Sequence, residues 1–317
     1  MPKRRLLGCS FPLAITLIII LLAMLVIGFL AGPVGKSMFG GINLPEWLSV
    51  SQPSPELPAE VVFHILGFAV TNSIVATWIT IIVLVGISYA VTRRMEIVPG
   101  RAQMAIEFIL GWLYDFCRSA AGDENGRRFF PLVTTIFLFV IINAWLALVP
   151  GYGSITINTH EGVAHLIRPA NTDINTPLAV AFVSVGLTFF YGFKSLGVKY
   201  AKKFVNVSNL GRGTALIFRG KIGAGASTLL TGIIEAFVGF LEFVSELIHV
   251  VSFTFRLFGN MTAGEILLLV AIFLVPWLFA VLFYGLELLI GFLQALIFAG
   301  LTLIFLTLAV AQHDESE

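Results

Sequence analysis

Long uncharged runs of apolar residues make up most of this chain. About 20 consecutive apolar residues cross the ~30 Å hydrocarbon core of a bilayer as an α-helix. The sequence has four runs of about this length and then an almost unbroken apolar region, namely residues 11–32, 72–92, 130–150, 174–193 and 226–312. We therefore expect an all-α integral membrane protein with about six membrane helices, the first of them an N-terminal anchor.

The last apolar region is too long for two ordinary spans. Residues 226–273 would form ~70 Å of helix and residues 277–312 about 54 Å, at 1.5 Å per residue. Pro276 is the natural turn between the two, because proline ends a helix at the preceding residue. The region either breaks into more spans or forms two long, strongly tilted helices.

Polar residues on either side of Pro276 favour the second arrangement. In an antiparallel pair of helices, residues that face each other share one midpoint in the sequence. Arg256 and Gln294 are centred on residue 275, and Glu265 and Glu287 are centred on residue 276. Two polar pairs with nearly the same midpoint predict a helical hairpin that turns at the proline.

The composition agrees with an exterior that faces lipid. Of 317 residues, 58% are hydrophobic and only 12% are charged, about half the usual charged share. A soluble fold of this size needs polar residues to cover its large exterior. This balance excludes a soluble enzyme, a nucleic-acid-binding protein and a disordered chain. The two cysteines, Cys9 and Cys117, are expected to be free thiols. Two cysteines are too few for a disulfide framework, and each lies beside a basic cluster that the topology below assigns to the cytoplasm.

Basic residues cluster on one predicted side of the membrane. Residues 1–5, 93–128 and 194–221 carry 16 of the 19 lysines and arginines, whereas the loops between these segments carry only Lys36 and Arg168. Cytoplasmic loops carry the excess of lysine and arginine in membrane proteins. Both termini are therefore expected in the cytoplasm.

These observations divide the chain into five parts. A cleaved signal peptide is the alternative for the first part, but its apolar stretch of about 20 residues is longer than usual for a signal, which favours a retained anchor. The parts are an anchor or signal segment (1–32), an extracytoplasmic loop (33–71), membrane helices with two basic cytoplasmic loops (72–225), a tilted helical hairpin (226–312) and a polar C-terminal tail (313–317).

The nineteenth basic residue, Arg256, lies inside the hairpin region. Arginine keeps its proton in proteins, and an ionisable residue at membrane depth is costly and by default functional. No acidic residue lies three or four positions away, and phenylalanine and leucine residues surround the arginine. Arg256 therefore needs a carboxylate from elsewhere. If this chain supplies none, a partner subunit must.

Three further polar residues share the helix face of Arg256. Glu235, Glu242, His249 and Arg256 repeat every seven residues. Seven steps of ~100° return within ~20° of the start, so the four form one slowly drifting stripe. For Glu235 and His249, interfacial or structural polar contacts are the plain alternative to a role in ion transfer.

The stretch SFTFRLFGNMTAGE from Ser252 to Glu265 resembles the hallmark of subunit a of bacterial F-type ATP synthases. Further matching pieces are LQA at 293–295, NTDINTPLA at 171–179, AIE at 105–107 and FPL at 130–132, with Pro99, Gly100 and Gln103 before them. Together the pieces span residues 99–312. The resemblance implies a hairpin of two long helices packed against a ring of c subunits.

The resemblance also implies roles for single residues. Arg256 would face the membrane carboxylate of the rotating c ring and be essential for translocation. The other implied residues are Asn260 and Gln294 near the arginine, Glu265 and Glu287 with Asp173 and Asn175 in an outer half-channel, and Glu242 with Ser245 in a cytoplasmic half-channel.

The sequence departs from the family pattern in two places. Many relatives pair an acid with a histidine where this chain has Glu265 and Glu287. Because two carboxylates within reach cannot both ionise cheaply, the pair either shares a proton or holds a water or cation between its members. Val250 stands where relatives often have proline, and His249 takes the basic position before it. Asp173 is equally well explained as a helix N-cap, since it precedes an apolar helix.

The resemblance implies a non-catalytic stator subunit of the bacterial plasma membrane that carries protons to and from the c ring. Its implied partners are the c ring, a b-type peripheral stalk, the other ATP synthase subunits and membrane lipid. The sequence contains no nucleotide-binding loop motif, and it suggests no cofactor, metal site or nucleic-acid partner.

Two other classes compete with this interpretation. A self-contained secondary ion transporter predicts inverted repeats, but the chain has no second copy of the Arg256 segment. A non-conducting structural subunit leaves the arginine and the membrane acids without a purpose.

Overall fold

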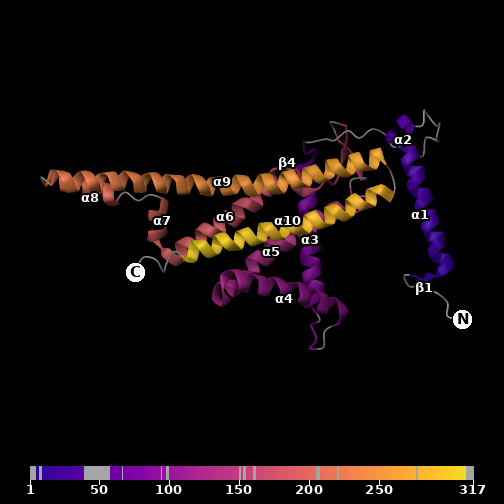
Figure 1. The fold of residues 1–317 in the computed structure, drawn as a ribbon, viewed down its shortest axis with the longest axis horizontal. Coiled ribbons are helices and arrows are strands. Elements are labelled where there is room, and N and C mark those ends of the chain that lie inside the picture. The colour runs from indigo at the N-terminus through magenta and orange to yellow at the C-terminus, as the bar shows by residue number, and fades with distance from the viewer. Residues whose placement is uncertain are drawn as a thin grey trace. The chain divides into compact units, whose positions relative to one another are not determined.

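The computed structural model is mostly helical (Figure 1). It describes residues 5–6, 9–38, 58–65, 67–93, 95–97, 100–149, 151–152, 155–159, 162–204, 208–219, 221–275 and 278–311. The predicted turn at Pro276 and the tail at 313–317 lie outside these residues. The division of the chain into anchor, loops, hairpin and tail stays a prediction.

Ten α-helices and one short 3₁₀ helix, η2 (Ala170–Thr172), lie in the described ranges. The α-helices are α1 (Phe11–Ala31), α2 (Pro33–Met38), α3 (Asn72–Thr92), α4 (Arg101–Ala121), α5 (Asp123–Ala147), α6 (Asn175–Leu196), α7 (Val198–Phe204), α8 (Ser208–Phe218), α9 (Ile222–Leu274) and α10 (Leu278–Ala311). Three short antiparallel ribbons accompany them: β1 (Arg5–Leu6) with β2 (Cys9–Ser10), β3 (Val61–Ile65) with β4 (Phe68–Thr71), and β5 (Thr156–Thr159) with β6 (Gly162–His165).

The all-α membrane architecture is confirmed. Five helices in the described residues, α3, α5, α6, α9 and α10, are long and apolar enough to cross a bilayer. The remaining predicted span, the N-terminal anchor, corresponds to α1. Its residues Ile18–Ala31 form an apolar helix that is shorter than the other five. The predicted third span begins earlier than its apolar run, because α5 starts at Asp123 with acidic residues in its first turn, where they complement the helix dipole.

The chain forms two compact units, each built from three separate segments. The first unit comprises Met1–Val75, Ala144–Thr172 and Gly259–Leu293, and the second comprises Ala76–Asn143, Asp173–Phe258 and Gln294–Glu317. Helices α9 and α10 therefore each contribute one part to each unit.

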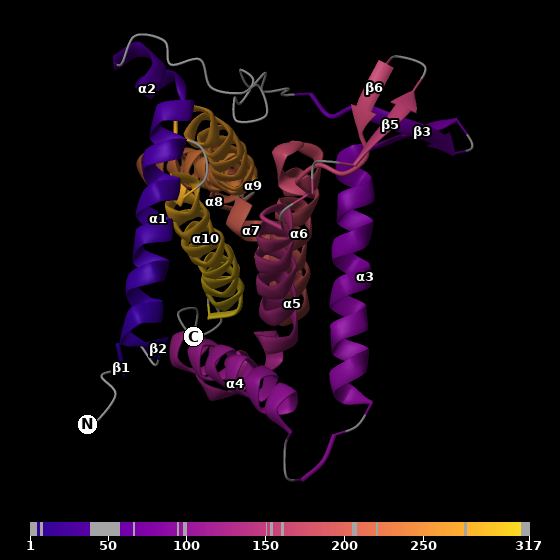
Figure 2. The ribbon, with the colours of Figure 1, turned by 90° about the vertical axis from the view of Figure 1, so that its right-hand side faces the viewer.

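In the first unit, the ribbons β3–β4 and β5–β6 lie together (Figure 2). The Glu60 carboxylate accepts a hydrogen bond from the backbone N–H of His165 at 2.8 Å, and the Glu60 carbonyl accepts one from the backbone N–H of Asn72. These bonds join the segment before β3 to the end of β6 and to the start of α3.

The core of the second unit includes aromatic side chains from α6 and α7. Tyr200 of α7 is almost fully buried and packs edge-on against Phe189 and Phe193. Gly192 of α6 leaves the space for it, since a Cβ atom there would lie 2.6 Å from the tyrosine ring. Burial, with the nearby acids Glu246 and Glu242, raises the pKa of Tyr200 to about 12.

Helix α4 is amphipathic and turns only a narrow face inward. Its buried residues are Leu113, Cys117 and Ala121. Gly122 follows in a left-handed conformation with φ 79°, which favours glycine. Arg118 pairs with Asp123 across this corner, and its Nε donates to Oδ1 at 2.6 Å.

In the second unit α9 and α10 run antiparallel. His249 stacks on Phe305 with ring centroids 4.2 Å apart, and Phe253 packs on Phe298 at 4.6 Å. In the first unit Gly264 of α9 lies against Glu287 of α10. The pairs 253 with 298 and 264 with 287 share a midpoint between residues 275 and 276, where the polar pairs of the sequence are also centred. The tilt of these helices and their packing on a ring stay predictions.

Candidate functional site

Arg256 lies on α9 within the second unit, and its guanidinium has weak polar contacts. Nη2 donates to the Ser252 hydroxyl at 3.4 Å, and Cζ lies 5.9 Å from the centroid of the Phe253 ring. Among the described residues no carboxylate lies within 4.0 Å of the guanidinium. A cation that cannot lose its proton is thus left without an acidic partner in this part of the chain.

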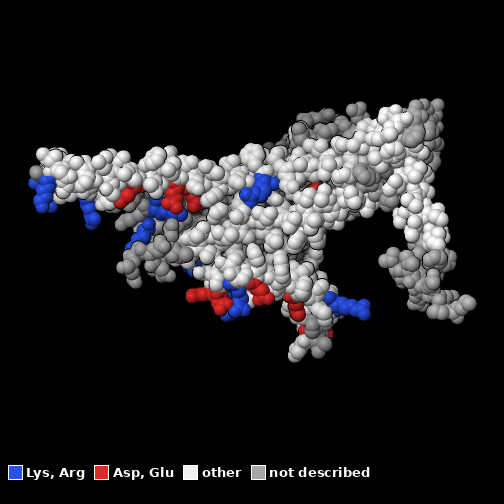
Figure 3. Space-filling model, in the orientation of Figure 1, with Lys and Arg blue, Asp and Glu red and all other residues white. Residues whose placement is uncertain are grey.

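The helix face around Arg256 is apolar and exposed. Ile248, Val251 and Phe255 each leave more than half of their surface uncovered. Figure 3 shows few charges over this part of the surface, with basic and acidic groups gathered near the start of α9 and around α4. An apolar surface of this extent on a membrane protein contacts lipid or another membrane subunit.

Two buried amides belong to the predicted surroundings of the arginine. Gln294 of α10, in the second unit, is 6% exposed and its Nε2 has no hydrogen-bond partner among the described residues. In the antiparallel register set by Phe253 and Phe298, Gln294 lies within about one residue of the level of Arg256. Asn260, in the first unit, likewise has a buried Nδ2 without a described partner.

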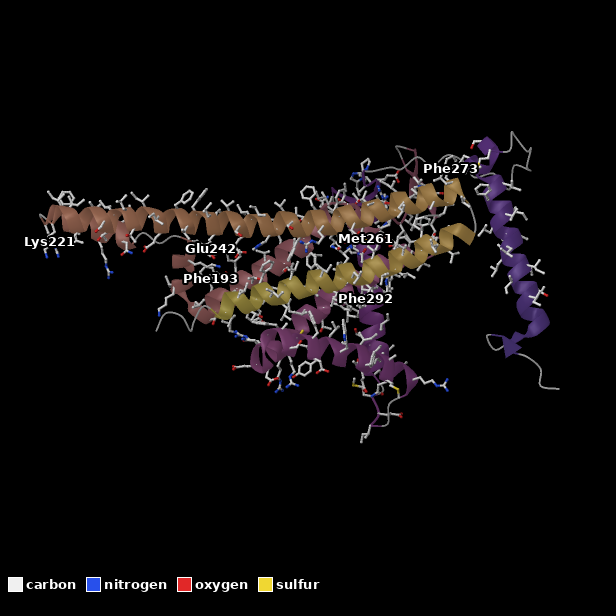
Figure 4. All side chains as sticks on the ribbon, viewed as in Figure 1. Phe193, Lys221, Glu242, Met261, Phe273 and Phe292 are labelled. Carbon is white, nitrogen blue, oxygen red and sulfur yellow. The ribbon has the colours of Figure 1, made fainter. Side chains whose placement is uncertain are left out.

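The acids near the start of α9 have polar partners within the second unit. Glu242 accepts an ion pair from Lys203 of α7 at 2.7 Å, and Figure 4 labels its position on α9. Glu235 accepts two hydrogen bonds from the Asn209 amide, at 2.8 and 2.9 Å. Ser245, the other predicted residue of the cytoplasmic path, is exposed.

The polar stripe of the sequence therefore has mixed surroundings. Glu235 and Glu242 hold α8 and α7 against α9, and His249 stacks on α10 while its Nδ1 lies 3.4 Å from Glu246. These contacts agree with the plain structural alternative for Glu235 and His249, and a role of either residue in ion transfer stays untested. Among the described residues, Glu235 and Glu242 are the stripe residues with a polar partner from another helix, whereas the polar contacts of His249 and Arg256 are to Glu246 and Ser252 of α9 itself.

The two predicted outer acids lie in the first unit and have different neighbours. Glu265 pairs with Arg168 at 3.3 Å. Glu287 is 6% exposed, and its carboxylate lies so close to Gly264 that a Cβ atom there would overlap it. Among the described residues Glu287 has no cation or hydrogen-bond donor in contact. Of these two glutamates, Glu265 thus has a cationic partner and Glu287 has none among the described residues.

Asp173 and Asn175 lie at the start of α6 in the second unit. Asp173 Oδ1 accepts hydrogen bonds from the backbone N–H of Asn175 at 3.1 Å and from its side-chain amide at 2.9 Å. The N-cap of α6 is Ile174, which has no side-chain cap hydrogen bond, so Asp173 forms an Asx turn directly before the helix. A place for both residues in an outer path stays a prediction.

Comparison with known proteins decides the family. The model of the family described as ATP synthase A chain matches residues 74–307. The ATP synthase subunit a of Citrifermentans bemidjiense is 31% identical over 245 residues, which is 77% of this chain and 90% of that protein. The subunit a of Gloeobacter violaceus is 31% identical over 244 residues, 77% of this chain and 85% of that one.

The chain belongs to the ATP synthase subunit a family. The resemblance found in the motifs around Arg256 is thereby confirmed. The matched region contains every residue that the sequence assigns to ion transfer. As a subunit a, the chain is a multi-pass membrane protein of the stator, and its partners are other ATP synthase subunits.

Sequence reasoning missed several residues that define these sites of the subunit a. Arg168 was expected only as one of two basic residues in outer loops, yet it pairs with Glu265. Gly264 stands in the hallmark segment, but only the structure shows that it makes room for Glu287. The rarity of basic residues outside the cytoplasmic clusters was the signal that marked Arg168 as unusual.

The described residues of this subunit a contain no group of three or more His, Cys, Asp or Glu side chains with the geometry to hold a metal ion. The sites consist of carboxylates, amides, a hydroxyl and arginines. Carboxylates can accept and release protons, amides and hydroxyls can form hydrogen bonds, and arginines can neutralise negative charges.

Proposed function

We propose that the chain is the proton-conducting stator subunit of a rotary ATP synthase. In this function Arg256 faces the membrane carboxylates of a c ring, and two offset half-channels carry protons to and from them. The observation that carries the proposal is the guanidinium of Arg256, which lies on an exposed apolar face and has no acidic partner among the described residues.

The electrostatic step follows from the environment of the ring carboxylate. In lipid, desolvation keeps a carboxyl group protonated, whereas a cation within ~4–6 Å favours the charged form. A ring acid is then neutral while it faces lipid and gives up its proton when it reaches Arg256. The arginine supplies a fixed charge that the ring passes, and it repels a proton that would leak directly between the half-channels.

The proposed outer half-channel runs along Glu265 and Glu287, with Asp173 and Asn175 near its entrance. Support comes from buried polar atoms in the first unit, on Asn72, Asn171 and Thr262, that have no hydrogen-bond partner among the described residues. Buried polar groups of this kind are the ones that ordered water satisfies in proteins. A wet path beside two carboxylates suits proton delivery.

The proposed cytoplasmic half-channel runs along Glu242 and Ser245. Glu242 is about one third exposed on its side chain even with Lys203 bound to it, so it can exchange protons with water. Under the positive-inside rule, the basic segments next to it support a cytoplasmic position for this end of α9. Both termini would then be cytoplasmic, in a bacterial plasma membrane.

Ion flow between the half-channels drives rotation, because each proton that crosses a potential of 100 mV releases ~2.3 kcal/mol. The chain itself carries out no ATP chemistry in this proposal. The c ring and a b-type peripheral stalk are its direct partners.

Arg256→Ala tests the function in inverted membrane vesicles that contain the assembled complex. ATP synthesis driven by the proton gradient should fall to background, while the amount of the subunit in the membrane stays near that of the unmodified protein. The second result is expected because no described acid depends on Arg256. Synthesis that survives Arg256→Ala would contradict the proposal, and proton transport by the purified chain without a c ring would favour a self-contained transporter.

A further inference from the structure

The two outer glutamates have different electrostatic surroundings. Both belong to the first unit, and Glu287 meets the backbone of Gly264, the residue next to Glu265. Two carboxylates within reach of each other at low dielectric cannot both carry a full charge cheaply. The charges around each carboxylate determine which of the two is ionised.

Arg168 is positioned to favour the ionised form of Glu265. Its side chain is only 11% exposed, and Nη2 lies 3.3 Å from Oε2 of Glu265, whose side chain is 28% exposed. Nη1 donates to the carbonyl of Pro58 at 3.0 Å, so one end of the guanidinium is held by the backbone while the other meets the acid. A planar guanidinium bound at two places presents its charge in a fixed position.

Other polar residues of the described outer segments have contacts or positions of their own. Glu60 accepts its bond from the backbone of His165, and the His64 side chain is exposed on β3. Lys36, the other basic residue of the predicted outer loops, lies on the short helix α2. Arg168 is the basic side chain whose contact with Glu265 is defined.

Glu287 has the opposite surroundings. It is more buried than Arg168, with 6% of its surface exposed against 9%, and its carboxylate lies against Gly264. A carboxyl without a compensating charge takes up a proton readily, and it releases the proton at acceptable cost only if its neighbour adds no uncompensated negative charge.

We propose that Arg168 is a positioning residue that holds Glu265 as a fixed, compensated carboxylate and so makes Glu287 the one acid of the pair that gains and loses the proton. This assignment rests on the proposed function and deepens it. In this assignment the two glutamates do not share a proton: Glu265 stays charged, and Glu287 alone is protonated and deprotonated.

Charge removal at Arg168 separates this role from simple attachment of the outer loop. In vesicles with the assembled complex, Arg168→Gln should lower ATP-driven proton pumping about tenfold, in the range expected for the loss of one strongly coupled contact. Arg168→Lys, which keeps the charge, should stay within about threefold of the unmodified protein.

The decisive measurement is a double substitution. Arg168→Gln leaves Glu265 as an uncompensated anion, and Glu265→Gln leaves Arg168 as an uncompensated cation. Arg168→Gln with Glu265→Gln removes both charges, so its pumping rate should exceed that of either single variant. Glu287→Gln should abolish pumping in every background.

Arg118→Gln is the matched control, because it removes an arginine from an exposed ion pair in the second unit and should leave pumping unchanged. The inference is overturned if Arg168→Gln pumps normally, or if the double variant is no faster than Arg168→Gln, since Arg168 would then only anchor the loop. If Arg256→Ala abolishes pumping while the Arg168 series is flat, this inference alone fails. If Arg256→Ala pumps normally, the proposed function fails first.

Discussion

Acidic residues lie in two stretches, one on α9 in the second unit and one on α9 and α10 in the first unit, and the two stretches differ in what each acid contacts. In the second unit Glu235 and Glu242 are half-buried and each has a polar partner from another helix. In the first unit Glu265 has its arginine, but Glu287 opposite Gly264 is buried with no described charge beside it. The comparison teaches that an acid with a partner stabilises the fold, whereas a buried acid without one costs stability and is kept for its chemistry.

Gly264→Ala breaks the site of the unpaired acid and should have the largest effect. The new methyl group would overlap the Glu287 carboxylate, so the acid must leave its position. Displacement of a reacting group by about 1 Å costs on the order of 100-fold in rate. Proton pumping in vesicles measures this loss.

Gly223→Ala provides the control on the same helix, because a Cβ atom at Gly223 meets nothing within 4 Å. Pumping by this variant should match that of the unmodified protein. Equal rates for Gly264→Ala and Gly223→Ala would show that the position of Glu287 is unimportant.

Gly192→Ala tests the packing behind the partnered acids and should change stability more than rate. Its Cβ atom would lie 2.6 Å from the buried ring of Tyr200, and overpacking of this kind typically costs about 1–3 kcal/mol. The apparent melting temperature of the detergent-solubilised complex should fall. Gly186→Ala on the same helix meets open space, so a similar fall in both variants would contradict the packing explanation.

Lys203→Gln removes the partner of Glu242 and should have the smallest effect. Both side chains of this pair keep some exposure, 18% and 35%, and ion pairs of this kind contribute about 0–1 kcal/mol. A change of melting temperature near the detection limit and a pumping rate within about twofold are expected. A loss as large as that of Gly264→Ala would erase the difference between the two stretches.

Much of the fold follows from the sequence because the bilayer imposes a simple rule. Apolar runs long enough to cross the hydrocarbon core became α3, α5, α6, α9 and α10. The hairpin midpoint near residue 276 also agrees with the contacts of Phe253 and Gly264, since antiparallel pairing depends only on position along the chain. Val250 in place of a proline leaves α9 uninterrupted.

The partners of the acids did not follow from the sequence. Arg168 lies nearly a hundred positions before Glu265, and Lys203 and Asn209 lie on short helices whose orientation no periodicity reveals. Such contacts depend on tertiary folding of loops, which local patterns do not encode. Arg256 was identifiable for the opposite reason, because its isolation from any acid is already visible in the neighbouring residues.

The buried thiol of Cys117 gives this subunit a built-in reporter of its own opening. The side chain is fully covered on the inner face of α4, and burial raises its pKa to about 11. Near neutral pH the thiolate that reacts with maleimides is therefore scarce as well as covered. The rate of labelling at this single atom measures how often α4 lifts from its core, which makes the motion of a membrane stator observable without introducing a new cysteine there.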